Sequence, residues 1–225
     1  PATLRGLSPD QTLVLVNGTR RHASALVNVN GTVGRGSAAV DLNAIPSGAL
    51  DRVEVLRDGA SAQYGSDAIA GVVNLRLKEA REGGGASVTY GQYFTNVETA
   101  RGKRDEQDGR AVTVSAWQGF GLGSDGFLTL SAEYSDRDPT NRSDYDPRPA
   151  ANGAITARFG DPKVEQWSVF ANAGKPLNAD WEAYGWAGYQ ERDSSSAAFP
   201  RLSNNPNNVP SIYPNGFLPK IAVNS

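Results

Sequence analysis

Apolar and polar residues alternate along most of the chain after its run of three glycines, and this period of two restricts the fold more than any other feature. In residues 127–135, for example, Leu128 and Leu130 share one face of an extended chain, and Thr129 and Ser131 share the other. Alternation of this kind predicts β-strands with one apolar face and one polar face. Five segments follow the pattern: 86–94, 111–118, 127–135, 166–173 and 181–190.

The connections between these predicted strands alternate in length. Barrels of bacterial outer membranes have short turns at one end and long loops at the other. No apolar run approaches the ~20 residues of a membrane-spanning helix, so a membrane crossing would have to use strands. The short links are 123–126 and 175–180, and the long links are 95–110, 136–165 and 191–216.

A soluble β-sandwich is the alternative to a barrel, since its strands also alternate and its core often contains tryptophan. Several aromatic residues lie toward the ends of the predicted strands, where the aromatic girdles of a membrane barrel are found. The pattern therefore favours antiparallel barrel strands and leaves the sandwich open. These aromatic residues are Tyr90, Trp117, Trp181 and Tyr189.

Residues 1–80 have a different pattern, in which short apolar runs are mixed with turn residues, and they predict a small α+β unit. A strand over 11–16 ends at Asn17-Gly18, a dipeptide typical of two-residue hairpin turns. Residues 19–22 would then return antiparallel to it. The other elements expected in this unit are strands at 52–56 and 71–78 and a short helix at 60–63.

The composition excludes several classes of function. With 22 basic and 24 acidic residues the net charge is −2, which gives no dense basic face for nucleic acid. The chain has no cysteine and a single histidine, His22, so disulfides, thiolate metal sites and sites built on two or more histidines are excluded. We therefore expect no nucleic-acid partner, no metal and no cofactor.

Two local patterns suggest sites that the surrounding sequence does not support. Residues 34–39 (GRGSAA) match a dinucleotide-binding fingerprint with Asp58 downstream, but Pro46 would interrupt the helix that must follow the glycines. An acidic stretch of the long link 136–165 offers oxygen ligands for calcium without the spacing of a known calcium loop. Its residues are Asp136, Asp138, Asp144 and Asp146.

Five motifs follow one another in the first 80 residues: Leu4-Arg5-Gly6, TLVLVNG at 12–18, LNAIP at 42–46, DRVEVLRDGASAQYGS at 51–66 and AIAGVVNL at 68–75. This ordered set resembles the plug domain of TonB-dependent outer-membrane receptors. One departure is Arg57-Asp58-Gly59, where the family more often has Arg-Gly-Pro, although both sequences make a tight turn. Residues 213–221 (YPNGFLPKI) also resemble a loop-to-strand return of some of these receptors.

The resemblance implies an α+β plug, a small mixed sheet with short helices, at residues 1–80, with its N-terminal part missing. Antiparallel transmembrane β-barrel strands would follow at 81–225. In such receptors a barrel of about 22 strands surrounds a plugged lumen. The chain after position 80 has room for five strands and the start of a sixth, so we expect an incomplete barrel and hence a fragment.

The function implied by the resemblance is that of a receptor and transporter in the outer membrane of a Gram-negative bacterium, surrounded by outer-membrane lipid. It would bind a scarce ligand, most often a ferric siderophore, and import it with energy supplied by TonB. TonB would be contacted through an N-terminal segment absent from this chain. No covalent chemistry is required, so we expect no enzymatic activity.

The resemblance also implies two groups of functional residues. Residues of an apical plug loop and a nearby turn would contact the ligand, and Arg35 among them could pair with an anionic group. Charges on the strand at 52–56 and beside it would dock the plug against the polar inner face of the barrel. The ligand-binding candidates are Asn28, Asn30, Thr32, Arg35, Ser37 and Tyr64, and the docking candidates are Asp51, Arg52, Glu54 and Arg57.

Two alternatives belong to other functional classes. A soluble periplasmic β-rich protein that binds glycans would use its tryptophans as stacking platforms for sugar rings. A secreted hydrolase would need paired carboxylates or an activated nucleophile, and no convincing set is found in the sequence. The tryptophans of the glycan-binding alternative are Trp117, Trp167, Trp181 and Trp186.

Overall fold

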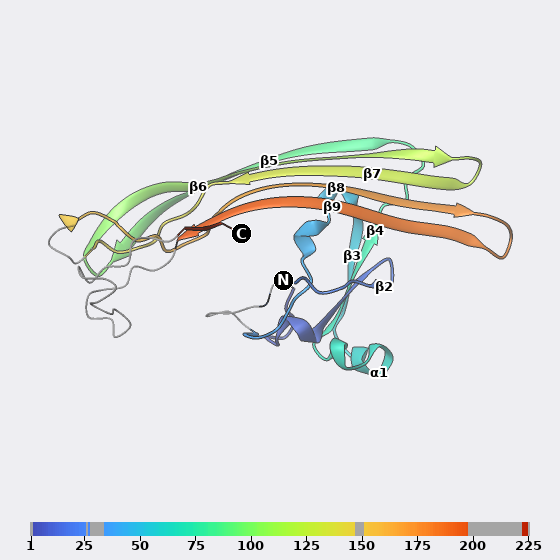
Figure 1. The fold of residues 1–225 in the computed structure, drawn as a ribbon, viewed down its shortest axis with the longest axis horizontal. Helices are drawn as coiled ribbons and strands as arrows, with labels where there is room; N and C mark the ends of the chain where they lie inside the picture. The colour runs from blue at the N-terminus through green and yellow to red at the C-terminus, as the bar shows by residue number, and fades with distance from the viewer. Residues whose placement is uncertain (1, 26, 28–33, 147–150, 198–221, 225) are drawn as a thin grey trace. The chain divides into compact units, whose positions relative to one another are not determined.

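The computed structural model describes residues 2–25, 27, 34–146, 151–197 and 222–224 (Figure 1). These residues form two compact units. The first unit comprises 1–86, 115–133 and 168–190, and the second comprises 87–114, 134–167 and 191–225. None of the helices in the described part of the chain has the length and apolar character needed to span a membrane.

A four-stranded sheet, called the small sheet below, lies in the first unit, with the strand order β2-β1-β4-β3. The central strands β1 and β4 are parallel, while β2 pairs antiparallel with β1 and β3 pairs antiparallel with β4. The small α+β unit expected at 1–80 is therefore confirmed as a mixed sheet with short helices. Its strands are β1 (Thr12–Val16), β2 (Thr19–Arg20), β3 (Leu50–Leu56) and β4 (Gly71–Leu77).

Strand β1 is apolar along almost its whole length because both of its faces are covered. Leu13 and Leu15 pack with residues of α1 (Ala60–Tyr64) and of the 3₁₀ turn η4 (Ser66–Ala68). Val14, Val16 and three apolar residues of β4 form a second cluster with residues between 42 and 50. That stretch carries the turns η2 (Leu42–Ala44) and η3 (Ser47–Ala49), and η1 (Pro9–Gln11) precedes β1.

The hairpin predicted at Asn17-Gly18 is confirmed. Both residues have positive φ, 48° and 81°, as a two-residue turn between antiparallel strands requires. The Asn17 side chain accepts a hydrogen bond from the Leu77 N–H at 2.9 Å, and the Asn17 N–H donates to the Leu75 carbonyl at 2.9 Å. The turn thus fixes the end of β4 as well as the hairpin.

A six-stranded sheet, called the long sheet below, has the order β10-β9-β8-β7-β6-β5, so every strand is beside its neighbour in sequence (Figure 1). All five segments with alternating residues are confirmed as strands, and a sixth begins near the C-terminus. The strands are β5 (Gly84–Thr99), β6 (Gly102–Leu122), β7 (Gly126–Arg137), β8 (Lys163–Pro176), β9 (Glu182–Ala197) and β10 (Ala222–Asn224).

The prediction of a long link at 95–110 is wrong. Strands β5 and β6 continue through it and are separated only by residues 100 and 101. Charged residues here interrupt the apolar alternation but pair with neighbours instead of forming a loop. Within the second unit Lys103 pairs with Glu98 at 2.7 Å, and the Asn96 amide donates to Asp105 at 2.9 Å.

The polarity of the long sheet in the first unit is the inverse of that in a water-soluble protein. The buried face of β7 and β8 is mostly small and polar, with Thr129, Ser131 and Ser168 below 9% exposed. The opposite face exposes Leu130 at 41% and Val169 at 43%. Exposed apolar and buried polar residues are typical of barrel strands in lipid, and a soluble sandwich has the reverse arrangement.

One aromatic side chain interrupts the polar buried face. Phe170 of β8 is 3% exposed and belongs to the same apolar cluster as Val14 and Val16 of β1. The small sheet and the middle of the long sheet therefore share a core within the first unit.

Candidate functional site

The candidate ligand-binding residues are only partly described by the structure. Asn28, Asn30 and Thr32 lie outside the described residues, as do 213–221. Arg35 is exposed, in a turn.

Two further candidates have structural contacts. The Ser37 hydroxyl donates to the Gly34 carbonyl at 2.5 Å, and Ser37 is 8% exposed, so it stabilises the turn that presents Arg35. Tyr64 is half-buried at the end of α1 and packs against the Leu13 cluster. Of the candidates that are described, Arg35 is the one with an exposed side chain.

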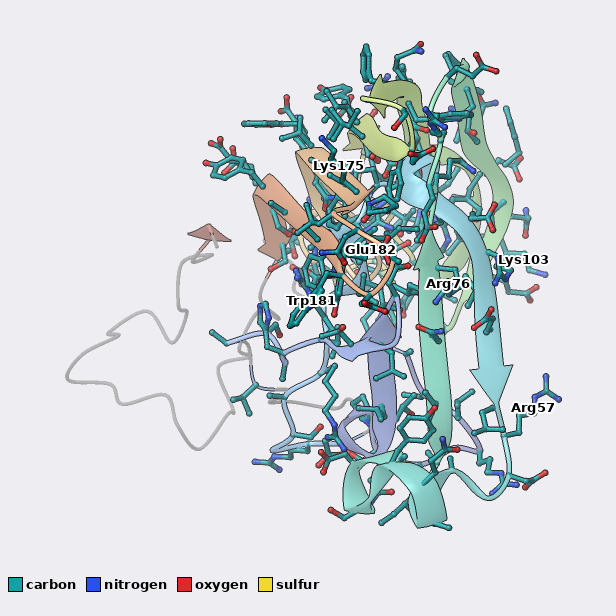
Figure 2. The ribbon with its side chains drawn as sticks, turned by 90° about the vertical axis from the view of Figure 1, so that its right-hand side faces the viewer. Arg57, Arg76, Lys103, Lys175, Trp181 and Glu182 are labelled. Carbon is teal, nitrogen blue, oxygen red and sulfur yellow. The ribbon has the colours of Figure 1, made fainter. Side chains whose placement is uncertain are left out.

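The structure brings Asp51, Arg52 and Glu54 together on the edge strand β3. Arg52 donates to Asp51 at 2.8 Å and to Glu54 at 2.9 Å, and the Asn74 amide of β4 donates to Glu54 at 2.8 Å. The Asn74 hydrogen bond, followed by that of Arg52, lowers the pKa of Glu54 from its ordinary value. Arg57 lies past the end of β3 and is directed away from the ribbon (Figure 2). Docking against a barrel by these charges stays a prediction.

Other residues join the small sheet region to the long sheet within the first unit. The Ser47 N–H and hydroxyl both donate to the Glu133 carboxylate of β7, at 3.0 and 2.5 Å. Gly48 lies so close to β6 that a Cβ atom on it would be 3.2 Å from Ser115 Oγ. The sequence pattern gave Glu133 and Ser115 no partner, because alternation assigns a residue to a face without showing what covers that face.

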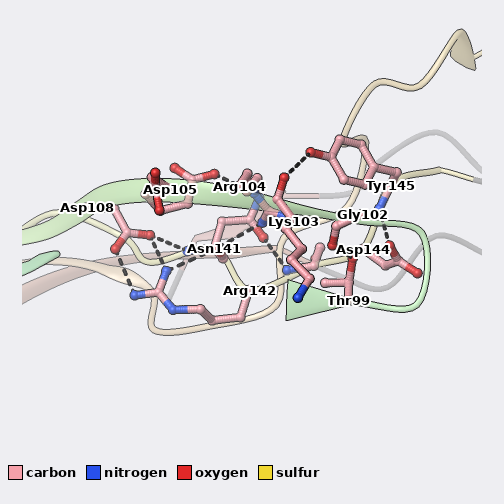
Figure 3. A network of polar contacts seen from close by, with 12 residues as sticks. Thr99, Gly102, Lys103, Arg104, Asp105, Asp108, Asn141, Arg142, Asp144 and Tyr145 are labelled. Atoms are coloured by element: carbon pink, nitrogen blue, oxygen red, sulfur yellow. Dashed lines mark hydrogen bonds and ion pairs between the residues drawn. The ribbon is translucent and has the colours of Figure 1, made fainter. Parts of the chain in front are cut away.

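In the second unit, charged residues of β6 bind the segment that follows β7 (Figure 3). Asp108 accepts hydrogen bonds from two guanidinium nitrogens of Arg142, at 2.6 and 2.9 Å, and from the Asn141 N–H at 2.8 Å. The Arg142 hydrogen bonds are the main cause of a lowered pKa at Asp108. Arg101 pairs with Asp144 at 2.6 Å. The segment is thus held on β6 and on the turn before it by ion pairs.

Three of the four acidic residues considered as calcium ligands form ion pairs with arginines. Arg110 pairs with Asp136 at 2.6 Å and with Asp138 at 2.9 Å, and Asp144 is paired with Arg101. Among the described residues no group of three or more acidic, histidine or cysteine side chains is arranged to hold a metal ion.

The comparisons with known proteins agree on a family. The family model described as the TonB-dependent receptor plug domain matches residues 1–72. The vitamin B12 transporter BtuB of Vibrio cholerae serotype O1 is 29% identical over 210 residues, which covers 87% of this chain and 29% of that protein. The ferric enterobactin receptor PirA of Pseudomonas aeruginosa is 37% identical over 94 residues, covering 42% of this chain and 12% of that protein.

The chain carries the plug domain of the TonB-dependent receptors at residues 1–72. Its fold is similar to that of a mutant ferric enterobactin receptor from Pseudomonas aeruginosa solved with enterobactin, with a TM-score of 0.60 and 21% identity. The likeness covers 86% of this chain and 26% of that one. Most of the small sheet lies within the residues that match the plug domain. The chain spans less than a third of the length of the relatives that it matches over most of its own length.

Two of the tryptophans considered as sugar platforms have cations of the chain over their rings. Lys78 Nζ lies 5.3 Å from the centroid of the Trp117 ring, and the Arg21 guanidinium lies 5.1 Å from that of Trp186. One face of each of these two rings is therefore covered by a cation of the chain itself.

Replacement of Asp108 by Asn should loosen the segment 138–146 of the receptor. The Asp108 and Arg142 side chains are only 15% and 27% exposed, so loss of their charge-assisted hydrogen bonds should cost about 1–3 kcal/mol of local stability. Trypsin cleavage after Arg142 should accelerate about tenfold at neutral pH. Asp105→Asn, which alters an exposed carboxylate of the same strand, is the control and should leave cleavage unchanged.

The same pair predicts a pH dependence. Because the folded pKa of Asp108 is lowered, its stabilisation is present above the ordinary value of about 3.9 and is lost as pH falls through the lower folded pKa. Hydrogen exchange in 138–146, corrected for intrinsic rates, should be slow down to about pH 5 and rise below about pH 4. An equal rise between pH 7 and 5 would contradict the assignment.

Proposed function

We propose that this receptor lies in the outer membrane of a Gram-negative bacterium and imports a scarce ligand with energy supplied by TonB. Residues 1–80 are the C-terminal part of the plug, and residues 81–225 are the first five to six strands of a transmembrane barrel. The long sheet is then part of the barrel, with the plug on its lumenal face. The reaction is binding and transport, with no enzymatic step.

The inverted polarity of the long sheet is the observation that carries the proposal. In the first unit the apolar face of β7 and β8 is exposed and the small polar face is covered by the plug. A barrel with lipid outside and a plug in its lumen accounts for both faces at once. A sheet in water would gain nothing from exposing Leu130 and Val169.

A ferric siderophore is the proposed ligand. Two ferric enterobactin receptors of Pseudomonas aeruginosa are 37% and 38% identical to this chain over 94 and 77 residues. Arg35 presents a guanidinium in an exposed turn, and such a group pairs well with anionic oxygen atoms. Asn28, Asn30 and Thr32 are proposed to contact the ligand with it. Because BtuB matches more of the chain, vitamin B12 is the competing ligand in the test.

The function is tested with cells that express the whole receptor. The receptor should be recovered in outer membranes, migrate differently on gels before and after heating, and support uptake of ferric enterobactin that stops when TonB is deleted. Uptake of vitamin B12 instead would replace the ligand and keep the transport function. A receptor recovered in the soluble periplasm would contradict the proposal.

Arg35→Ala in the whole receptor should weaken binding of the anionic ferric siderophore. Loss of a charge-assisted contact costs about 1.5–3 kcal/mol, so the Kd should rise about tenfold or more. Arg57→Ala, which removes the same charge from the end of β3, should leave the Kd unchanged. Binding is measured with purified receptor in detergent, and an unchanged Kd for Arg35→Ala would remove Arg35 from the ligand site.

A further inference from the structure

Residues 78–83, which connect β4 to β5, are bound to the long sheet by directional hydrogen bonds. The segment reaches three strands, and both the N–H and the carbonyl of Ala80 are engaged by one threonine hydroxyl. This segment is called the hinge below. Its bonds run from Asn172 Nδ2 to the Lys78 carbonyl (3.0 Å), from Ala80 N to Thr129 Oγ1 (2.9 Å), from Thr129 Oγ1 to the Ala80 carbonyl (3.3 Å) and from Gly119 N to the Gly83 carbonyl (2.8 Å).

A second attachment of the plug to the long sheet is of a different kind and runs through Arg21, immediately after β2. The Arg21 N–H donates to the Val14 carbonyl at 2.9 Å, which fixes the residue to β1. Its guanidinium lies over the Trp186 ring of β9, and Trp186 stacks on Phe170 of β8 with centroids 6.0 Å apart and planes at 15°. The contact of Arg21 with Trp186 is called the latch below.

The two attachments differ in what it takes to open them. The hinge is continuous with β5, and moving it would break several hydrogen bonds of buried or half-buried groups together. The latch is a cation–π contact, worth about 0.5–2 kcal/mol, beside an edge strand of two residues. The apolar contacts around it are non-directional, in contrast to the hydrogen bonds of the hinge.

We propose that Arg21 is a positioning residue of the plug, and that the plug opens at the latch while the hinge keeps it attached to β5. Release of Arg21 from Trp186 loosens β2 first, because β2 is an edge strand of two residues, whereas β1 remains paired with β4. A role for this opening in import rests on the proposed function. The mechanical difference between latch and hinge does not depend on the proposed function, so it can be measured without ligand or TonB.

Hydrogen exchange of the whole receptor in detergent, followed by mass spectrometry of its peptides, tests the latch. Arg21→Gln removes the cation and should raise exchange in residues 12–21 about threefold to tenfold, with exchange in 78–83 unchanged. Arg21→Lys keeps a cation over Trp186 and should restore slow exchange. Arg101→Gln makes the same charge change in the second unit, where Arg101 pairs with Asp144, and should leave 12–21 unchanged.

The hinge is tested with Thr129→Val, which removes both bonds to Ala80 while preserving the shape of the side chain. Exchange should rise in 78–83 and remain slow in 12–21. If Arg21→Gln raises exchange equally in both segments, or in neither, the latch is overturned. The latch is likewise overturned if Arg21→Lys behaves like Arg21→Gln.

Uptake measurements separate this inference from the proposed function. If the receptor imports no ligand but exchange responds as expected, the latch stands and the import function fails. If the receptor imports its ligand and Arg21→Gln leaves exchange in 12–21 unchanged, the import function stands and the latch fails.

Discussion

The ring of Phe170 completes the core of the plug, and the arrangement of the first unit depends on this contact. Val14 and Val16 of β1 pack with Val73 and Leu75 of β4 on the face that receives the ring, and Phe170 is 3% exposed. Burial of one such side chain contributes about 1.5–3 kcal/mol. The plug sheet therefore gains part of its stability from a strand about a hundred residues later in the chain.

The remaining contacts of the first unit follow from this packing. With Phe170 packed against the small sheet, polar side chains of the long-sheet strands lie within hydrogen-bond distance of Ser47 and Ala80. Glu133 receives both donors of Ser47, and Thr129 receives and returns bonds at Ala80. The bonds at Ala80 belong to the hinge, where several hydrogen bonds would have to break together before the segment could leave the long sheet.

Local sequence patterns predicted the strands and turns. What each of them packs against is determined by contacts between residues far apart in the sequence. The Asn17-Gly18 hairpin and the alternating strands could be predicted, because turn geometry and the sheet face on which a side chain lies both depend on neighbouring residues in the sequence. The strands within 95–110 were missed because charged residues interrupt the apolar alternation there, and the partners of these charges lie across the β5–β6 turn or in the segment after β7. For the same reason Arg52 and Glu54 were recognised as a charged set while Phe170, an apolar residue in an alternating strand, gave no signal of its role.

A disulfide between the plug and β6 most directly tests the claim that the plug packs on the long sheet and must move away from it during import. The chain has no cysteine, and a Cβ atom on Gly48 would lie 3.2 Å from Ser115 Oγ. In a whole receptor with Gly48→Cys and Ser115→Cys, the account predicts that a disulfide forms in oxidising conditions. Ligand binding should persist, and import should stop until a reductant is added. Failure of the two cysteines to pair, or undiminished import by the cross-linked receptor, would contradict the account.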